Sequence, residues 1–351
     1  MSGVSLERKI ETRQLVNIIA LFLVVQFGGL LIAIYTTPSI LYYVQGNSVQ
    51  INSFEGAFIY LVYIMVATAA LLLLMRFYKK PGIFKLMEAV VILMATGYVI
   101  FSILSTALPI ANPNDLLIFS GVATGILIIA KNIRPGLRNF LAVSSSIGVG
   151  ILIGSNGFYL AYFLMLLITV YDYVAVFITK HMLTMAKEIS SKNLAFLIGS
   201  TDYEAVPKKY LSKKDLAEYR KQGKPTDPFV KGLLKKGIFP VVSQVQLGTG
   251  DLALPLMLSV SAYISFLSYS VAVMIAIGAS AGMIFTMYLL KKYKVALPAI
   301  PPLFAFCNLF LGIFFAVNNV QDYRSWLGFI IIAVAIVLAL FNRLNSSTNT
   351  Q

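Results

Sequence analysis

The chain has 351 residues, of which 58% are hydrophobic and only 12% are charged, and its mean hydropathy is +0.83. Soluble domains need more charge at their surfaces, so this composition excludes an ordinary soluble globular protein. The net charge of +14 at pH 7 would suit a nucleic-acid partner, but the placement of the cations argues against one. The single cysteine, Cys307, excludes an internal disulfide, and the single histidine, His181, argues against a histidine-based zinc site or a Ser-His-Asp triad.

Apolar runs near or above the ~20 residues that cross a bilayer as a helix recur along the whole chain. They predict spans at 15–35, 56–75, 87–108, 115–131, 137–154, 157–180, 239–263, 266–290, 297–317 and 326–342. The first run is too long for a signal-peptide core and has no small-residue cleavage site behind it, so we interpret it as a membrane helix. The predicted fold is therefore an all-α polytopic membrane protein.

The basic residues fall almost entirely on one side of these spans. If the spans alternate in direction, Arg324 is the exception among the 28 Lys and Arg residues. The positive-inside rule then places the N-terminus and the long 181–237 loop in the cytoplasm of a cell-membrane protein. Cations at these positions lie where anionic lipid headgroups attract them, which favours the lipid bilayer over nucleic acid as their partner.

The chain divides around one long polar segment. Residues 1–180 are predicted to form a six-helix N-terminal membrane half, 181–237 a basic cytoplasmic loop, and 238–351 a C-terminal membrane half. Within the loop, Ser212 is a predicted N-cap of a short helix, and the Gly, Pro and Lys residues near 221–231 predict a mobile segment. Outside the loop, two GxxxG pairs favour close helix packing, namely Gly121 with Gly125 and Gly150 with Gly154.

Two aspartates, Asp172 and Asp251, lie well inside apolar runs. A carboxylate in hydrocarbon costs at least ~2.5–3.5 kcal/mol even on insertion scales, so we expect both side chains to be used. Asp172 lies ~12 Å from the cytoplasmic end of its predicted helix and Asp251 roughly 15–20 Å from the same side, so the two can meet. Two carboxylates that share one proton can activate a water and polarise a peptide carbonyl without any metal or cofactor.

The residues around Asp251 predict an irregular helix. Gly248 and Gly250 weaken a helix and let another backbone come close, and Pro255 has no N–H to bond the Asp251 carbonyl. Further along, the segment 296–303 (ALPAIPPL) has three prolines in five positions, which predicts extended backbone. Extended backbone beside two carboxylates is suited to pairing with a substrate in strand form.

These three elements resemble the motifs of the presenilin and signal-peptide-peptidase family of intramembrane aspartyl proteases. The family's Tyr-Asp, Gly-x-Gly-Asp and Pro-Ala-Leu motifs are matched by Tyr171-Asp172, by Gly248, Thr249, Gly250 and Asp251, and by Pro298, Ala299 and Ile300. Ile300 departs from the family's leucine. The resemblance runs from the first predicted span through the ninth and implies a bundle of nine transmembrane helices. Residues 325–341 add a tenth C-terminal apolar helix, which would leave Gln351 in the cytoplasm.

The resemblance also implies roles for the matched residues. Asp172 and Asp251 would be the catalytic dyad of an enzyme that cuts within transmembrane segments of membrane proteins. The substrate-binding residues would be Tyr171, Gly248, Thr249, Gly250, Pro298, Ala299 and Ile300. No metal or cofactor is implied.

The orientation inferred from the charges is similar to that of presenilins. The short chain with compact links resembles a microbial homologue that acts without accessory subunits, and a homo-oligomer is compatible with it. The alternative function is a membrane transporter or cation leak channel, in which the same carboxylates carry protons or ions.

Overall fold

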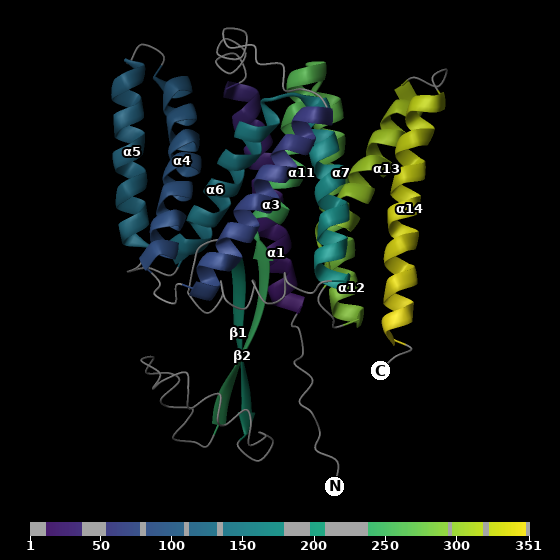
Figure 1. The fold of residues 1–351 in the computed structure, drawn as a ribbon. Helices are drawn as coiled ribbons and strands as arrows, with labels where there is room; N and C mark the ends of the chain where they lie inside the picture. The colour runs from purple at the N-terminus through teal and green to yellow at the C-terminus, as the bar shows by residue number, and fades with distance from the viewer. Residues whose placement is uncertain are drawn as a thin grey trace. The chain divides into compact units, whose positions relative to one another are not determined.

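The computed structural model describes residues 12–36, 54–77, 82–108, 112–131, 136–178, 197–207, 238–293, 297–318 and 323–348. The chain separates into two compact units (Figure 1). One unit comprises Met1–Ile18 with Gly199–Gln246, and the other comprises Ile19–Ile198 with Leu247–Gln351. The second unit contains both Asp172 and Asp251.

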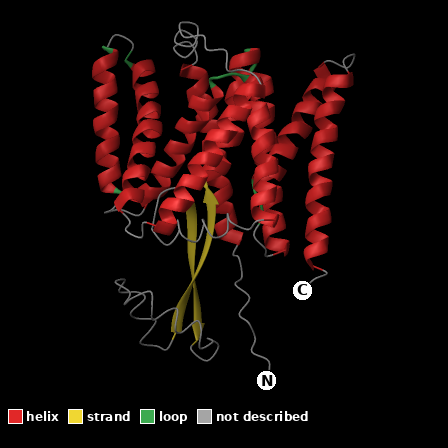
Figure 2. Cartoon of the chain, in the orientation of Figure 1, coloured by secondary structure: helices red, strands yellow, loops and turns green. Residues whose placement is uncertain are grey.

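Helices dominate the described residues (Figure 2). In chain order the elements are α1 (Thr12–Leu23), the π-helix η1 (Val24–Gly28), α3 (Phe54–Phe77), α4 (Gly82–Ala107), α5 (Pro113–Ala130), α6 (Gly136–Gly154), α7 (Phe158–Tyr173), the π-helix η2 (Val174–Ile178), β1 (Leu197–Pro207), β2 (Ile238–Gly248), α11 (Thr249–Phe266), α12 (Tyr269–Tyr293), α13 (Ile300–Asn318) and α14 (Tyr323–Thr348). The helix that contains η1 continues to Thr36.

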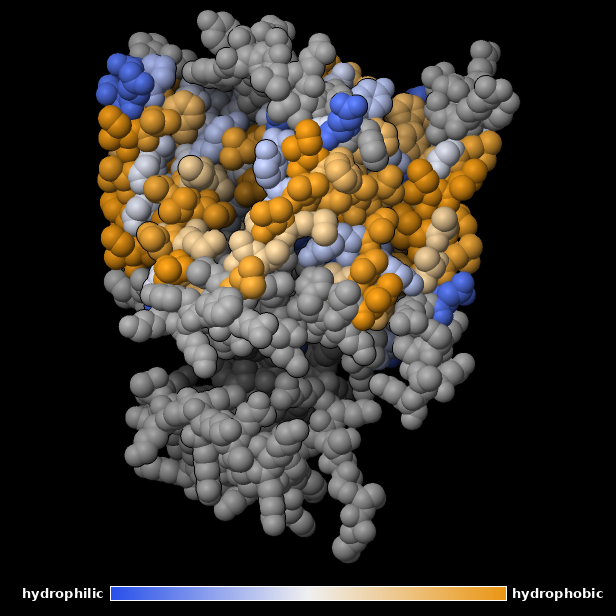
Figure 3. Space-filling model, in the orientation of Figure 1, coloured by the Kyte–Doolittle hydropathy of each residue, from blue (hydrophilic) through white to orange (hydrophobic). Residues whose placement is uncertain are grey.

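The helices of the described part have the length and apolarity of membrane spans. Eight of them can cross a bilayer by these criteria, and α3 and α14 contain the shorter apolar stretches Phe58–Ala67 and Trp326–Asn342. Figure 3 shows an apolar band over the helices, with many of the hydrophilic residues near its edges. Large apolar side chains of these helices are exposed, such as Met94 on α4 at 70% and Ile129 on α5 at 68%, as expected of a surface that faces lipid. The predicted all-α polytopic membrane fold is confirmed.

Helix α11 lies at the centre of the second unit and packs against α6, α7, α12 and η1. Small residues allow this approach: a Cβ on Gly150 would lie 2.9 Å from a side-chain atom of α11, and one on Gly154 would lie 2.7 Å from an α11 carbonyl oxygen. Close packing predicted for this GxxxG pair is therefore confirmed. The prediction is wrong for Gly121 and Gly125, because a Cβ on either would meet no described atom within 4 Å.

The predicted tenth apolar segment forms a helix that packs on the rest of the unit. Helix α14 lies against α13, where Phe315 and Phe329 stack with ring centroids 5.9 Å apart. Trp326 and Ile330 of α14 lie close to Gly312 of α13, which has no side chain to separate the helices. The two helices run antiparallel, so the C-terminal end of α14 lies at the same end of the unit as the start of α13 (Figure 1).

The start of the predicted seventh span is wrong. Residues 238–248 form strand β2, which pairs with β1 in a two-stranded sheet, and the helix begins only at Thr249. The segment is apolar enough to extend a hydropathy window, yet it is rich in β-branched residues and alternates Gln and apolar residues at 244–247, a period-2 pattern that favours a strand. The predicted helix after Ser212 and the mobile segment at 221–231 lie outside the described residues.

The extended segment predicted at 296–303 is shorter than expected. Only residues 297–299 of its described part are non-helical, and α13 begins at Ile300. Pro301 and Pro302 therefore lie in the first turn of α13. A proline is tolerated there because the first-turn N–H groups have no intrahelical partner in any case.

Candidate active site

Asp172 lies near the C-terminal end of α7, directly before the π-helix η2, and only 3% of it is exposed. The backbone N–H of Ile300 donates to its Oδ2 at 3.2 Å. This donor belongs to the start of α13, where N–H groups have no partner within the helix. The Asp172 side chain therefore ties α7 to the first residues of α13.

Asp251 lies in the first turn of α11, which begins directly after strand β2. Gly248 is the N-cap residue of this helix, and a Cβ on it would lie 3.2 Å from Asp251 Oδ2, so the carboxyl lies close to the N-cap. An acidic third residue beside the N-cap is the placement found in a capping box. The irregular backbone predicted around Asp251 is thus a helix start, whereas from Thr249 onward α11 runs through Pro255 without interruption.

The two carboxylates lie close enough for their charges to interact directly. Among the described residues, no Lys or Arg forms an ion pair with either of them. Asp172 instead accepts a hydrogen bond from the Ile300 N–H at the start of α13, and Asp251 lies in the first turn of α11. The structure therefore brings two acids from distant parts of the chain together in a site without a neutralising cation.

The remaining predicted site residues surround this pair. Pro298 is buried, and Ala299 is half-buried in the short non-helical segment before α13. Gly250 is exposed, and a Cβ built on it would meet no described atom within 4 Å. Thr249 is half-buried, as is Tyr171, which precedes Asp172 on α7. The substrate-binding role of Tyr171 stays a prediction.

Two residues that the sequence reasoning missed contact the same turn of α11. The hydroxyl of Ser146 on α6 donates to the Thr249 carbonyl at 3.2 Å. The side-chain amide of Gln26 in η1 donates to the Leu252 carbonyl at 2.9 Å. Gln26 could have been found from the sequence, because it is a single amide within the apolar run LFLVVQFGGL.

A small cavity of about 120 Å³ lies beside the first turn of α11. Its lining residues are Val91, Ser145, Ser146, Val149, Thr249, Gly250 and Ala253. The hydroxyls of Ser145 and Ser146 bond backbone carbonyls, so the cavity is mainly apolar. Among the described residues, no group of three or more His, Cys, Asp or Glu side chains could hold a metal ion.

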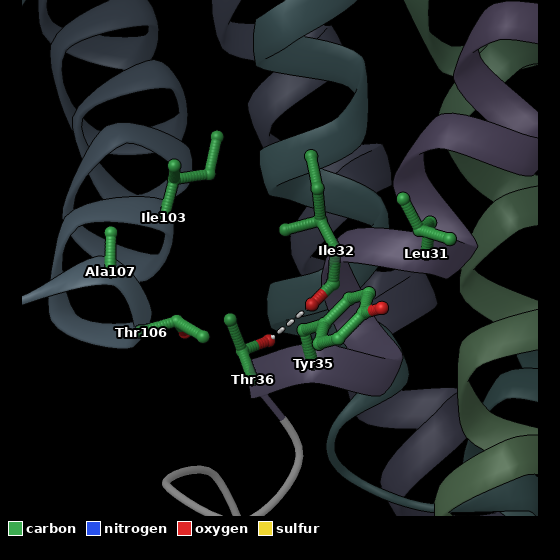
Figure 4. A pocket seen from close by; sticks show the side chains of 7 residues that line it. All are labelled: Leu31, Ile32, Tyr35, Thr36, Ile103, Thr106 and Ala107. Carbon is green, nitrogen blue, oxygen red and sulfur yellow. Dashed lines mark hydrogen bonds between the residues drawn. The ribbon is translucent and has the colours of Figure 1, made fainter. Parts of the chain in front are cut away.

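A second pocket, of about 270 Å³, lies between the helix that ends at Thr36 and the end of α4 (Figure 4). It is lined by Leu31, Ile32, Tyr35, Thr36, Ile103, Thr106 and Ala107. The hydroxyls of Thr36 and Thr106 bond carbonyls of their own helices, and the lining contains no acid, histidine or cysteine. The described lining of this pocket therefore offers no acid–base or thiol group for catalysis.

Comparison with known proteins supports a specific family. The family model described as "Signal-peptide peptidase, presenilin aspartyl protease" matches residues 19–317. A solved structure of a presenilin family intramembrane aspartate protease, in space group C222, aligns with a TM-score of 0.56 at 19% identity, over 86% of this chain and 99% of that one. A structure of a presenilin family intramembrane aspartate protease in space group P2 gives a TM-score of 0.48 at 21% identity, over 83% and 97%. No curated protein matches the chain.

Proposed function

The chain belongs to the signal-peptide peptidase and presenilin aspartyl protease family, and on that premise we propose that Asp172 and Asp251 are the dyad with which it hydrolyses peptide bonds within transmembrane segments. The main support is the meeting of the three motifs in one place. The carboxylate of Asp172 accepts a hydrogen bond from the N–H of Ile300 and interacts electrostatically with Asp251. The N-terminal half, 1–180, would supply one acid, and the C-terminal half, 238–351, the other.

In the proposed reaction, the pair holds one proton. One carboxylate takes a proton from a water molecule while the other donates a hydrogen bond to the scissile carbonyl oxygen. The water oxygen bonds to the carbonyl carbon and forms a tetrahedral intermediate. A proton then passes from the pair to the amide nitrogen, the C–N bond breaks, and a new carboxyl end and a new amino end result. No metal or cofactor takes part in these steps.

The substrate would lie beside the non-helical segment at 297–299 and would fill the open space at Gly250. A helical substrate hides its peptide bonds in internal hydrogen bonds, so it must be locally extended before it can be cut. Pro298 and Ala299 keep the adjacent backbone extended, and Gly250 lets the substrate backbone approach the first turn of α11. Tyr171, Thr249 and Ile300 would complete this surface.

The test is hydrolysis by the purified full chain reconstituted in liposomes with a model transmembrane substrate. Mass spectrometry should find paired products cut within the spanning segment, and an aspartic-protease transition-state inhibitor should suppress them. The absence of cleavage, combined with proton or cation flux through the same liposomes, would favour the transporter or leak channel. Because no other protein is added, cleavage would also indicate that accessory subunits are dispensable.

For the membrane topology, we propose that the N-terminus, the 181–237 loop and Gln351 lie in the cytoplasm and that the chain resides in the cell membrane. The support is the placement of Lys and Arg, together with the antiparallel pairing of α13 and α14. A tag placed after Gln351 should become accessible only when cells are permeabilised. Labelling of that tag in intact cells would overturn the orientation of α14.

A further inference from the structure

The turn that carries Asp251 receives two hydrogen bonds from other helices. The Ser146 hydroxyl on α6 bonds the Thr249 carbonyl, and the Gln26 amide in η1 bonds the Leu252 carbonyl. These two carbonyls belong to the residues two before and one after Asp251 in the chain. The side chains of Gln26 and Ser146 therefore hold the backbone on both sides of the aspartate.

Gln26 has an environment that would suit a hydrocarbon side chain better. It is completely buried in an apolar helix, and its Oε1 has no hydrogen-bond partner among the described residues. A buried polar atom without a partner costs free energy, so an amide kept at this position needs an offsetting benefit. Gln26 also lies in the π-helix Val24–Gly28, and single π turns within α-helices occur often at functional sites. Within the part of the chain that the structure describes, the hydrogen bond of the Gln26 side chain is the one to the Asp251 turn.

The first turn of α11 needs such support from outside. Thr249 and Gly250 line the cavity of about 120 Å³, so packing does not fix them on that side. Pro255 has no N–H, and the Asp251 carbonyl therefore lacks the hydrogen bond that normally holds the start of a helix to its next turn. One turn further on, Gly29 and Gly150 both approach Leu256 closely, which lets the two supporting helices come near α11.

We propose that Gln26 and Ser146 are positioning residues that hold the Asp251 carboxyl in line with Asp172. This inference rests on the proposed protease function and assigns no chemical step to either side chain. Loss of either bond would let the first turn of α11 shift toward the cavity. A displacement of about 1 Å at a reacting group can lower a rate by as much as about a hundredfold.

The experiment compares matched variants of the full chain in the liposome assay. Gln26→Leu and Ser146→Ala each remove one of the two hydrogen bonds. Ser280→Ala on α12 is the control for a lost hydroxyl, because the Ser280 hydroxyl bonds the Ala276 carbonyl of its own helix. Tyr162→Phe is the control for a lost interhelical bond elsewhere, since the Tyr162 hydroxyl bonds Asn308 Oδ1 between α7 and α13 at 2.7 Å. The measurements are kcat, KM, the pH profile and the thermal midpoint.

Gln26→Leu and Ser146→Ala should each lower kcat by about tenfold or more, with KM changed by less than about twofold, because the loss lies in alignment and not in binding. Their pH limbs should move, since the surroundings of the dyad change. Ser146→Thr retains the hydroxyl and should recover most of the rate. The two controls should keep the wild-type kcat and pH profile.

The outcomes separate this inference from the function it rests on. A wild-type chain that cuts no substrate, or an Asp251→Asn variant that still cuts, would overturn the proposed function itself. A wild-type chain that cuts, together with Gln26→Leu and Ser146→Ala variants that match the controls, would overturn only the positioning role. Equal losses of kcat in Tyr162→Phe and Gln26→Leu would likewise overturn it, because the effect would then be general to interhelical bonds.

Discussion

Buried or half-buried acids occur in two regions of the described helices, and their surroundings differ. Glu88 on α4 is 1% exposed and forms an ion pair with Lys131 at the end of α5. Asp172 and Asp251 are close enough for their charges to interact, and among the described residues neither has a cation for a partner. An acid that is neutralised by a neighbouring cation contributes to packing, whereas two acids whose charges interact titrate as a pair and are suited to acid–base chemistry.

The largest expected effect comes from the dyad. Asp172→Asn or Asp251→Asn should abolish measurable proteolysis while the thermal midpoint stays close to that of the wild type. The double variant should be no worse than either single one, because the two carboxylates act as a unit. The assay is product formation by the purified, folded chain. Near-normal turnover in either single variant would show that Asp172 and Asp251 are not the catalytic pair.

The second effect concerns stability and should be confined to the ion pair. Glu88→Gln leaves the partly covered Lys131 ammonium without this partner, and breaking a buried pair in this way costs about 3–5 kcal/mol. The thermal midpoint in detergent should fall, and kcat per folded molecule should stay near the wild-type value. Replacing both residues, Glu88→Gln with Lys131→Met, should restore part of the stability. A loss of kcat without a loss of stability would show that the two regions are not separate in role.

Much of this arrangement can be predicted from the sequence because charged side chains are costly to place in hydrocarbon. Asp172 and Asp251 stand out in apolar runs, and the helices follow from the length of those runs. Glu88 is harder to recognise, since it lies at the edge of the predicted span 87–108, where an acid resembles an ordinary interfacial residue. Its burial depends on α5 and α6, which no local pattern reveals.

Other features depend on tertiary structure or on a different periodicity. Hydropathy extended the seventh span back to 239 because it measures apolarity and does not distinguish strand from helix, so β2 was missed. The hydrogen bonds of Gln26 and Ser146 join helices that are far apart in the chain. A sequence can mark a polar residue in an apolar run, but it does not identify the carbonyl that the residue will bond.

The third effect is the pH dependence of hydrolysis. Only the singly protonated pair can both accept a proton from water and donate one to the carbonyl, so kcat/KM should be bell-shaped, with limbs that belong to the pair. Glu88→Gln should leave both limbs unchanged, because this acid lies outside the pair. The test is to measure the pH profiles of kcat/KM for folded Glu88→Gln and for the wild type in parallel. A limb that moves in Glu88→Gln, or an activity that rises steadily to pH 9, would contradict the assignment.

The smallest effect distinguishes two glycines of the same motif. A Cβ on Gly248 would lie 3.2 Å from Asp251 Oδ2, closer than most real contacts, so Gly248→Ala should push the carboxyl aside and lower kcat several-fold. A Cβ on Gly250 would point into space that the substrate is proposed to fill, so Gly250→Ala should act mainly through a higher KM.

Gly97 on α4 is the matched control from the other region, because its Cβ would meet Thr124 Oγ1 at an ordinary 3.6 Å. Gly97→Ala should change neither constant. Equal losses of kcat in Gly248→Ala and Gly97→Ala would mean that the rate depends on helix packing in general. The region of Asp172 and Asp251 would then not differ from the region of Glu88 in its effect on kcat.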